Sequence, residues 1–337
     1  NLIGDFDFSL SGSPVYKTYK LTTSVVNDSK KNIHGFGNIF IVDKNINLDI
    51  DFDLDNFDLS FLSSFGKNKV NKINGVVTGK LNLWGSMSDI KLKGQTFINK
   101  GNLYFPITNT EYKIKDGTPI YFQDQSIKFV NTELVDIYQN TFAKANGNLF
   151  HKNFKEWGID LDVNTQRLLV FNKAKNLESR FYGKGFLNGK ASFKGPFKSL
   201  NLSVSGVTAN GTNIVIPWQE NKGLSDTSFI DFLPKSQNKV KESVNELSSF
   251  DEQLRGLEMI FDLDITRDAE LEIVVDQKSG STLSGRGNGK ILIETNTDGK
   301  FNIFGDYITY DGIYNFKNLG LIDKKFIVKP GGSIIWN

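Results

Sequence analysis

The sequence contains no cysteine and only two histidines, His34 and His151, in 337 residues. Without cysteine the fold needs no disulfide bonds. With no cysteine and no third histidine, the chain cannot form a conventional catalytic triad or a histidine-rich metal site. We therefore expect neither an enzyme nor a metalloprotein, and we expect no cofactor.

An excess of charge of one sign and long apolar runs are also absent. Forty basic residues against 38 acidic ones give a formal net charge of +2, and no basic block interleaved with aromatic residues marks a nucleic-acid groove. No apolar run approaches the ~18 residues of a membrane span, and no signal-peptide pattern is present. We expect a soluble segment with no nucleic-acid partner. Because the chain opens within a repeating pattern and stops at Trp336-Asn337, we expect it to belong to a longer protein.

Residues 79–105 show the pattern on which the rest of the chain is built. Leu81 and Leu83 alternate with polar neighbours, and so do Ile90 and Leu92. A period of two places the apolar side chains on one face of a strand and the polar ones on the other. Glycines between these runs mark turns or bulges. The pattern predicts a row of antiparallel strands with one apolar face and one polar face.

This pattern occurs three times along the chain. Gly-Lys dipeptides begin at 79, 189 and 289, and each follows an acidic alternating strand at near-constant spacing. The acidic strands are 49–53, 160–163 and 262–265. Features that recur in the same order indicate a structural repeat in which each unit packs mainly on its neighbours. We expect one continuous elongated body over residues 1–337, with approximate units at 34–142, 146–223 and 257–337.

Residues 225–256 depart from this pattern. Apolar residues from Val240 to Leu257 recur at helical spacing and form one stripe. Pro234 and Gly256 fit the two ends of a short helical insertion. Its other face mixes both signs of charge, which disfavours a helix lying on anionic lipid. The helix either covers the open side of the sheet or serves as a partner-docking or gating element.

Two segments resemble ligand-binding loops, one for calcium and one for phosphate, but each lacks residues that such a loop requires. Four aspartates alternate between 49 and 55, but Leu54 and Ser60 occupy the positions where a calcium loop needs Gly and Glu. These acids are the solvent face of a strand. Residues 285–290 are rich in glycine, but they lack the Ser or Thr that follows Lys in a phosphate-binding loop and lead into a strand.

Three features resemble the C-terminal region of the TamB family, which contains the inner-membrane-anchored component of the translocation and assembly module of Gram-negative bacteria. They are the Gly-Lys-hydrophobic cassettes, the segment 101–106 and the closing segment 326–336. The resemblance covers essentially the whole chain. It implies an all-β fold, in which an elongated, repeat-built antiparallel sheet curls into a trough (a β-taco) with an apolar interior. The helical insertion and the end at Asn337, where family members continue, depart from the family pattern.

The resemblance also implies a location, partners and a task. TamB-like proteins span the periplasm of Gram-negative bacteria and are anchored in the inner membrane, here through a segment N-terminal to the residues given. They dock by their C-terminal end on a TamA-like outer-membrane β-barrel protein with POTRA domains. They are similar to AsmA-like bridges that move phospholipid between membranes. On this basis the docking candidates are Phe326, Val328, Ile334 and Trp336.

The apolar strand positions are the candidate groove for phospholipid acyl chains. At ~0.8 kcal/mol per CH₂, exposing two chains of about sixteen carbons to water costs on the order of 25 kcal/mol, which a continuous apolar lining would remove. A filled core is the alternative use of the same residues. The candidates are Leu81, Leu83, Phe97, Leu103, Phe105, Phe193, Leu202, Val204, Ile214, Ile216, Ile291, Ile293, Phe301, Ile303, Tyr314 and Phe316.

Two other functions stay open at this point. Exposed edge strands suit a scaffold that assembles or secretes outer-membrane proteins by adding a strand to its sheet, without conducting lipid. A repeat adhesin or a polysaccharide-acting solenoid enzyme would instead need a pair of carboxylates at catalytic separation, and nothing in the acidic strands distinguishes such a pair.

Overall fold

The computed structural model describes residues 5–27, 30–60, 72–106, 108–175, 181–217, 256–296, 300–318 and 321–336. These residues form one sheet of twenty strands. The strands are β1 (Asp5–Ser13), β2 (Thr18–Asn27), β3 (Lys30–Val42), β4 (Asn45–Asp58), β5 (Lys72–Ser86), β6 (Asp89–Phe105), β7 (Thr110–Ile114), β8 (Thr118–Asp124), β9 (Ser126–Asp136), β10 (Phe142–Lys152), β11 (Lys155–Lys173), β12 (Tyr182–Pro196), β13 (Leu200–Thr208), β14 (Asn213–Pro217), β15 (Leu257–Ile265), β16 (Glu270–Asp276), β17 (Ser281–Asn296), β18 (Phe301–Asn318), β19 (Ile322–Ile327) and β20 (Ser333–Trp336).

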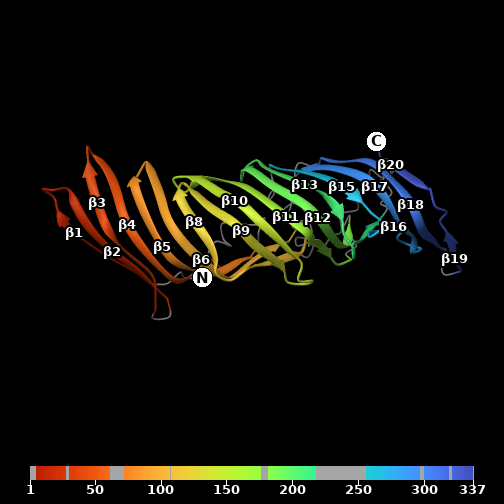
Figure 1. Ribbon diagram of the computed structural model, residues 1–337, viewed down its shortest axis with the longest axis horizontal. Coiled ribbons are helices and arrows are strands. Elements are labelled where there is room, and N and C mark those ends of the chain that lie inside the picture. The colour runs from red at the N-terminus through yellow and green to blue at the C-terminus, as the bar shows by residue number, and fades with distance from the viewer. Residues whose placement is uncertain are drawn as a thin grey trace, which may run out of the picture.

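The fold is all-β, and the strands follow one another along the long axis from β1 at one end to β19 and β20 at the other (Figure 1). Within the described ranges, no helix has the length and apolar character needed to cross a membrane. The helical insertion expected at 225–256 lies outside the described residues, apart from Gly256, which precedes β15.

Most neighbouring strands are antiparallel, as the alternating pattern predicts. From β1 to β6 the chain forms a simple meander. Beyond it, long strands are flanked by two shorter strands that lie end to end, such as β8 and β7 beside β6 and β13 and β14 beside β12. The pairs β13–β15 and β14–β16 are parallel, which the sequence pattern does not predict. They arise because β14 ends at one edge of the sheet whereas β15 begins at the other, beside Leu200.

A line of bulges and strand breaks runs along the sheet and divides it into two walls. Register shifts interrupt β4–β5, β5–β6, β9–β10, β10–β11, β11–β12 and β17–β18. A bulge adds a residue to one strand and bends it, and the short strands of each flanking pair separate at the same line. We call this the fold line. Wall A contains β8, β13, β15 and β20, wall B contains β7, β14, β16 and β19, and the long strands cross from one wall to the other.

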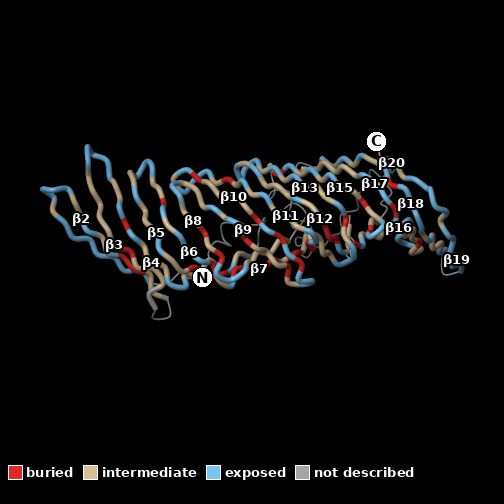
Figure 2. Tube along the Cα trace, viewed as in Figure 1, coloured by how far each residue is buried: buried red, intermediate tan, exposed pale blue. Residues whose placement is uncertain are grey.

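The most deeply buried apolar side chains lie on the fold line. One cluster centres on Val77, Ile98 and Ile120, and a second on Tyr112, Ala143 and Leu168. A third contains Ile265, Ala269 and Tyr307. Away from this line most apolar strand residues are only half-buried. In Figure 2 the buried residues are short stretches within strands that are otherwise half-buried or exposed. The described residues therefore form a single curled sheet and not a filled sandwich.

The acidic strand and the Gly-Lys strand of each sequence repeat are direct neighbours. They are β4 and β5 in the first copy, β11 and β12 in the second, and β15 and β17 in the third. Each pair is joined by an ion pair across the polar side: Lys80 with Asp53 at 3.2 Å, Lys194 with Asp160 at 3.5 Å, and Lys290 with Asp264 at 3.7 Å. The approximate boundary at 142–146 falls inside β10, where the sheet continues without a break.

The repeated glycine has a steric cause. A Cβ atom on Gly79, Gly189 or Gly289 would come within 2.7, 2.6 or 2.9 Å of a Cα atom in the next strand. Real side chains do not tolerate such distances from backbone atoms, so only glycine permits the strands to approach this closely.

Candidate functional site

The strand register assigns side chains to two faces of the sheet. Residues that are paired across an antiparallel ladder lie on the same face, and successive residues alternate. Ile50, Leu83 and Leu92 are paired across β4, β5 and β6 and share one face, which we call the apolar face. Asp51 and Asn82 are paired in the next row and lie on the opposite, polar face.

The apolar face is continuous across the middle and C-terminal part of the sheet. One row crosses six strands from β11 to β18, a distance of about 24 Å at the usual strand spacing. Every side chain in it is half-buried. A row of half-buried apolar side chains offers apolar contact along its whole length. The row consists of Val163, Ala191, Val204, Phe261, Ile293 and Ile303.

All but two of the groove candidates from the sequence lie on this apolar face. Those of wall A are Leu81, Leu83, Phe193, Leu202, Val204, Ile291, Ile293 and Ile303. Those of wall B are Leu103, Phe105, Ile214, Ile216, Tyr314 and Phe316. The register thus brings candidates from all three repeat units onto one surface, distributed over both walls.

Phe97 and Phe301 are placed differently. Phe97 is paired with Thr78 and Pro119, lies on the polar face and is 43% exposed. Its neighbour Ile98 is buried on the apolar face instead. Two adjacent apolar residues satisfy the alternating pattern in either register, and only the pairing decides between them. Phe301 pairs through its backbone with Thr295, and its side chain is not among those described.

The acidic strands contribute groove residues that sequence reasoning missed. Because their aspartates lie on the polar face, the residues between them lie on the apolar face. Phe52 is paired with Leu81, Leu161 with Phe193, and Leu263 with Ile291. The same alternation could have predicted these three residues, because the side chains between the aspartates point to the face opposite the acids.

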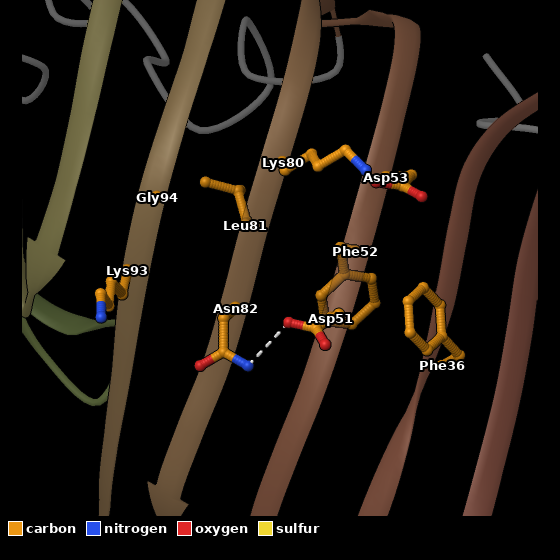
Figure 3. Close-up of a pocket in the computed structure, with 9 residues that line it drawn as sticks. All are labelled: Phe36, Asp51, Phe52, Asp53, Lys80, Leu81, Asn82, Lys93 and Gly94. Carbon is orange, nitrogen blue, oxygen red and sulfur yellow. Dashed lines mark hydrogen bonds and ion pairs between the residues drawn. The ribbon is translucent and has the colours of Figure 1, made fainter.

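A shallow depression of about 540 Å³ lies over β4 to β6, lined by Phe36, Asp51, Phe52, Asp53, Lys80, Leu81, Asn82, Lys93 and Gly94 (Figure 3). The Asn82 amide donates a hydrogen bond of 2.9 Å to each of the carboxylates of Asp49 and Asp51. Asp53 is paired with Lys80. The carboxylates therefore have partners from the adjacent strand, and the described part of the chain holds no acid or histidine cluster suited to a metal ion.

His151 has a structural role at the hairpin between β10 and β11. It is buried and stacks on Phe154, with 4.6 Å between ring centroids, and it also contacts Trp157 at 4.6 Å. Its Nδ1 accepts a hydrogen bond of 3.1 Å from the backbone N–H of Phe154. Burial lowers the pKa of His151, which favours the neutral ring that this acceptor role requires.

The docking candidates lie on two edge strands that both pair with β18. Phe326 of β19 is 51% exposed and stacks on Tyr314. Ile334 and Trp336 of β20 are paired with Tyr307 and Gly305, and Trp336 packs on the third buried cluster. Val328 follows β19, and its Cβ lies against Gly312. Among the described strands, β19 and β20 have β18 as their sole neighbour, so each presents one free backbone edge.

Comparison with known protein families agrees with this architecture. A model of the TamB C-terminal domain matches residues 133–337, which is more than half of the chain and extends from β9 to the last strand. Searches of curated proteins and of solved structures returned no match. The chain therefore belongs to the TamB family.

Proposed function

We propose that this segment provides an apolar groove along which phospholipid acyl chains pass between the inner and outer membranes of a Gram-negative bacterium. The TamB family consists of bacterial envelope proteins that act in assembly and transport. The observation that carries the proposal is the continuous row of half-buried apolar side chains from Val163 to Ile303. We further propose that the segment lies in the periplasm, that the longer protein is anchored in the inner membrane, and that it catalyses no reaction.

The physical basis is the cost of moving acyl chains through water. Two chains of about sixteen carbons expose apolar surface worth on the order of 25 kcal/mol, so unassisted crossing is negligibly slow. Interchangeable apolar side chains on both walls lower this barrier at every point along the groove. Such a path needs many Leu, Ile, Val and Phe residues of similar kind, and the three repeats supply them.

A charge on the apolar face tests this proposal. In the full-length protein, Ile303→Asp should abolish lipid transfer between donor and acceptor vesicles and remove phospholipid crosslinks from a photoreactive residue at Phe193. The matched control is Asn302→Asp, because Asn302 is exposed and lies on the polar face of the same strand. If Ile303→Asp keeps its melting temperature and transfers lipid at the wild-type rate, the conduit is disproved.

Docking on an outer-membrane partner is a second candidate function, and the free edges of β19 and β20 favour it. We propose that a TamA-like β-barrel protein with POTRA domains adds a strand to one of these edges, since exposed edges recruit extended segments. In this form the protein is an assembly scaffold, and docking is also compatible with lipid transfer.

Removal of β20 and the end of β19 separates the two functions. Deleting residues 326–336 should abolish pull-down of the barrel partner, and Phe326→Asp should weaken it in a protein whose chain is intact. Ile303→Asp should leave pull-down unchanged, since it alters the groove alone. Undiminished pull-down by the folded deletion variant would refute docking through β20 and the end of β19.

A further inference from the structure

Charged side chains are rare on the apolar face. Among the described strand positions on this face they are Asp124, Asp136, Lys173, Asp276 and Lys324. Asp124 ends β8, Asp276 ends β16 and Lys324 lies on edge strand β19, and all three are exposed. Asp136 is fully buried, but its carboxylate accepts hydrogen bonds from its own turn. Lys173 differs from the other four, because it is half-buried beside apolar residues.

Lys173 is the last residue of β11 and lies at the outer margin of wall B. Its partner across the ladder is Gly183, which is paired in turn with Ile214 of β14. Phe171 lies on the same face two residues earlier, opposite Gly185. A Cβ on Gly185 would lie 3.2 Å from the Phe171 Cβ and 3.7 Å from the Ile214 Cδ1. Lys173 therefore lies on an apolar surface, and the residues paired with it and with Phe171 are glycines that carry no side chain.

This cation has no internal partner within the described part of the chain. Its pKa is lowered from the ordinary lysine value, and burial is the sole cause, with no carboxylate opposing it. A partly desolvated charge without a counter-ion costs folding stability. Its long stem can rest on the wall while the ammonium reaches the margin of the groove. An external anion held at that margin would compensate the charge.

We propose that Lys173 binds the phosphate of a net-anionic phospholipid whose acyl chains lie in the groove. The inference rests on the proposed conduit function, because the tails are what bring the head group to this margin. A single anionic group at the end of apolar chains matches one cation at the edge of an apolar wall. One lysine near an anionic lipid surface corresponds to about a five-fold gain in affinity over a lipid of zero net charge.

The test compares lipids of equal acyl composition. The full-length protein is incubated with vesicles of phosphatidylcholine containing an equal share of phosphatidylglycerol, then re-isolated, and its bound lipid is quantified by mass spectrometry. Wild-type protein should retain phosphatidylglycerol about five-fold more than phosphatidylcholine. Lys173→Gln should remove this preference, whereas Lys173→Arg should keep it. Lys184→Gln is the matched control, because Lys184 is exposed on the polar face of the neighbouring strand.

The outcomes distinguish a failure of the Lys173 head-group assignment from a failure of the proposed conduit function. If wild-type protein retains neither lipid, the conduit itself fails. If it retains both lipids equally, or if folded Lys173→Gln keeps the preference, the head-group assignment is wrong while the conduit stands. The last measurement adds inorganic phosphate at millimolar concentration to the lipid-free protein. If it binds the protein in a Lys173-dependent way without lipid, the site is one for the free anion and the lipid assignment is overturned.

Discussion

The hydroxyl of Tyr112 donates a hydrogen bond of 2.8 Å to the backbone carbonyl of Leu169. This bond joins β7 to β11, which are not ladder partners, past the turn between β9 and β10. A second link lies beside it, where the carbonyl of Thr108 accepts a hydrogen bond of 2.9 Å from the N–H of Asn172. Wall B is therefore held together here by contacts outside the strand ladder.

Replacing Tyr112 by Phe should lower the free energy of unfolding by about 1–2 kcal/mol, because the buried Leu169 carbonyl loses its donor. Burial raises the pKa of Tyr112 to about 12. The folded state then holds a proton that the unfolded state releases above pH 10, so this stability is present below pH 10 and is lost as the pH rises toward 12. Tyr112→Phe should reduce the alkaline loss in urea unfolding between pH 8 and 12. An unchanged alkaline slope would contradict this account.

Replacing Gly189 by Ala should destabilise the sheet by about 2 kcal/mol or more. The new Cβ would lie 2.6 Å from the Gly206 Cα and against the Ser205 carbonyl oxygen, so the backbone of β12 or β13 must shift. The control is Asn188→Ala, an exposed neighbour in the same strand. Thermal unfolding compares the two variants. Equal melting temperatures would show that the close approach is not required.

Asp136 should be essential for the β9–β10 turn. Its carboxylate accepts bonds of 2.9, 2.9 and 2.7 Å from the N–H groups of Tyr138, Gln139 and Thr141, and one of 2.5 Å from the Thr141 hydroxyl. Asp136→Asn turns one acceptor into a donor that faces Thr141, at a cost of about 2–3 kcal/mol. Asp124→Asn, in an exposed turn, should cost little. Urea unfolding of the two variants measures the difference, and similar midpoints would argue against this role.

Lys173→Met should raise the stability of the lipid-free protein. Burial lowers the pKa of Lys173, so the unfolded state binds more protons in the window below the ordinary value of 10.5, and stability rises with pH through that window. Removing the charge should increase the melting temperature at pH 7 and flatten its rise toward pH 10. Lys184→Met should change neither quantity. A lower melting temperature for Lys173→Met would mean that the cation has a stabilising partner.

Sequence patterning predicted the faces of the sheet well. The alternation around Leu81 and Leu83 assigned them to the apolar face, and the aspartates at 49–53 marked the opposite one; both assignments agree with the ladder. Phe97 shows where alternation is insufficient, because it adjoins Ile98 and the pattern permits either to face inward. The helical period at 225–256 concerns residues outside those described.

Local sequence patterning is sufficient to predict that strands form, which side of each is apolar, and that the unit repeats, because alternation and glycine placement act over a few residues. The pairing of the strands in space was needed to establish where the fold line runs, that β13 and β15 are parallel, and that Lys173 lies on the apolar face. The reason is that each bulge shifts the alternation by one residue, and a shift of one residue moves a side chain to the other face. Whether a bulge forms depends on pairing with a strand that is distant in the sequence.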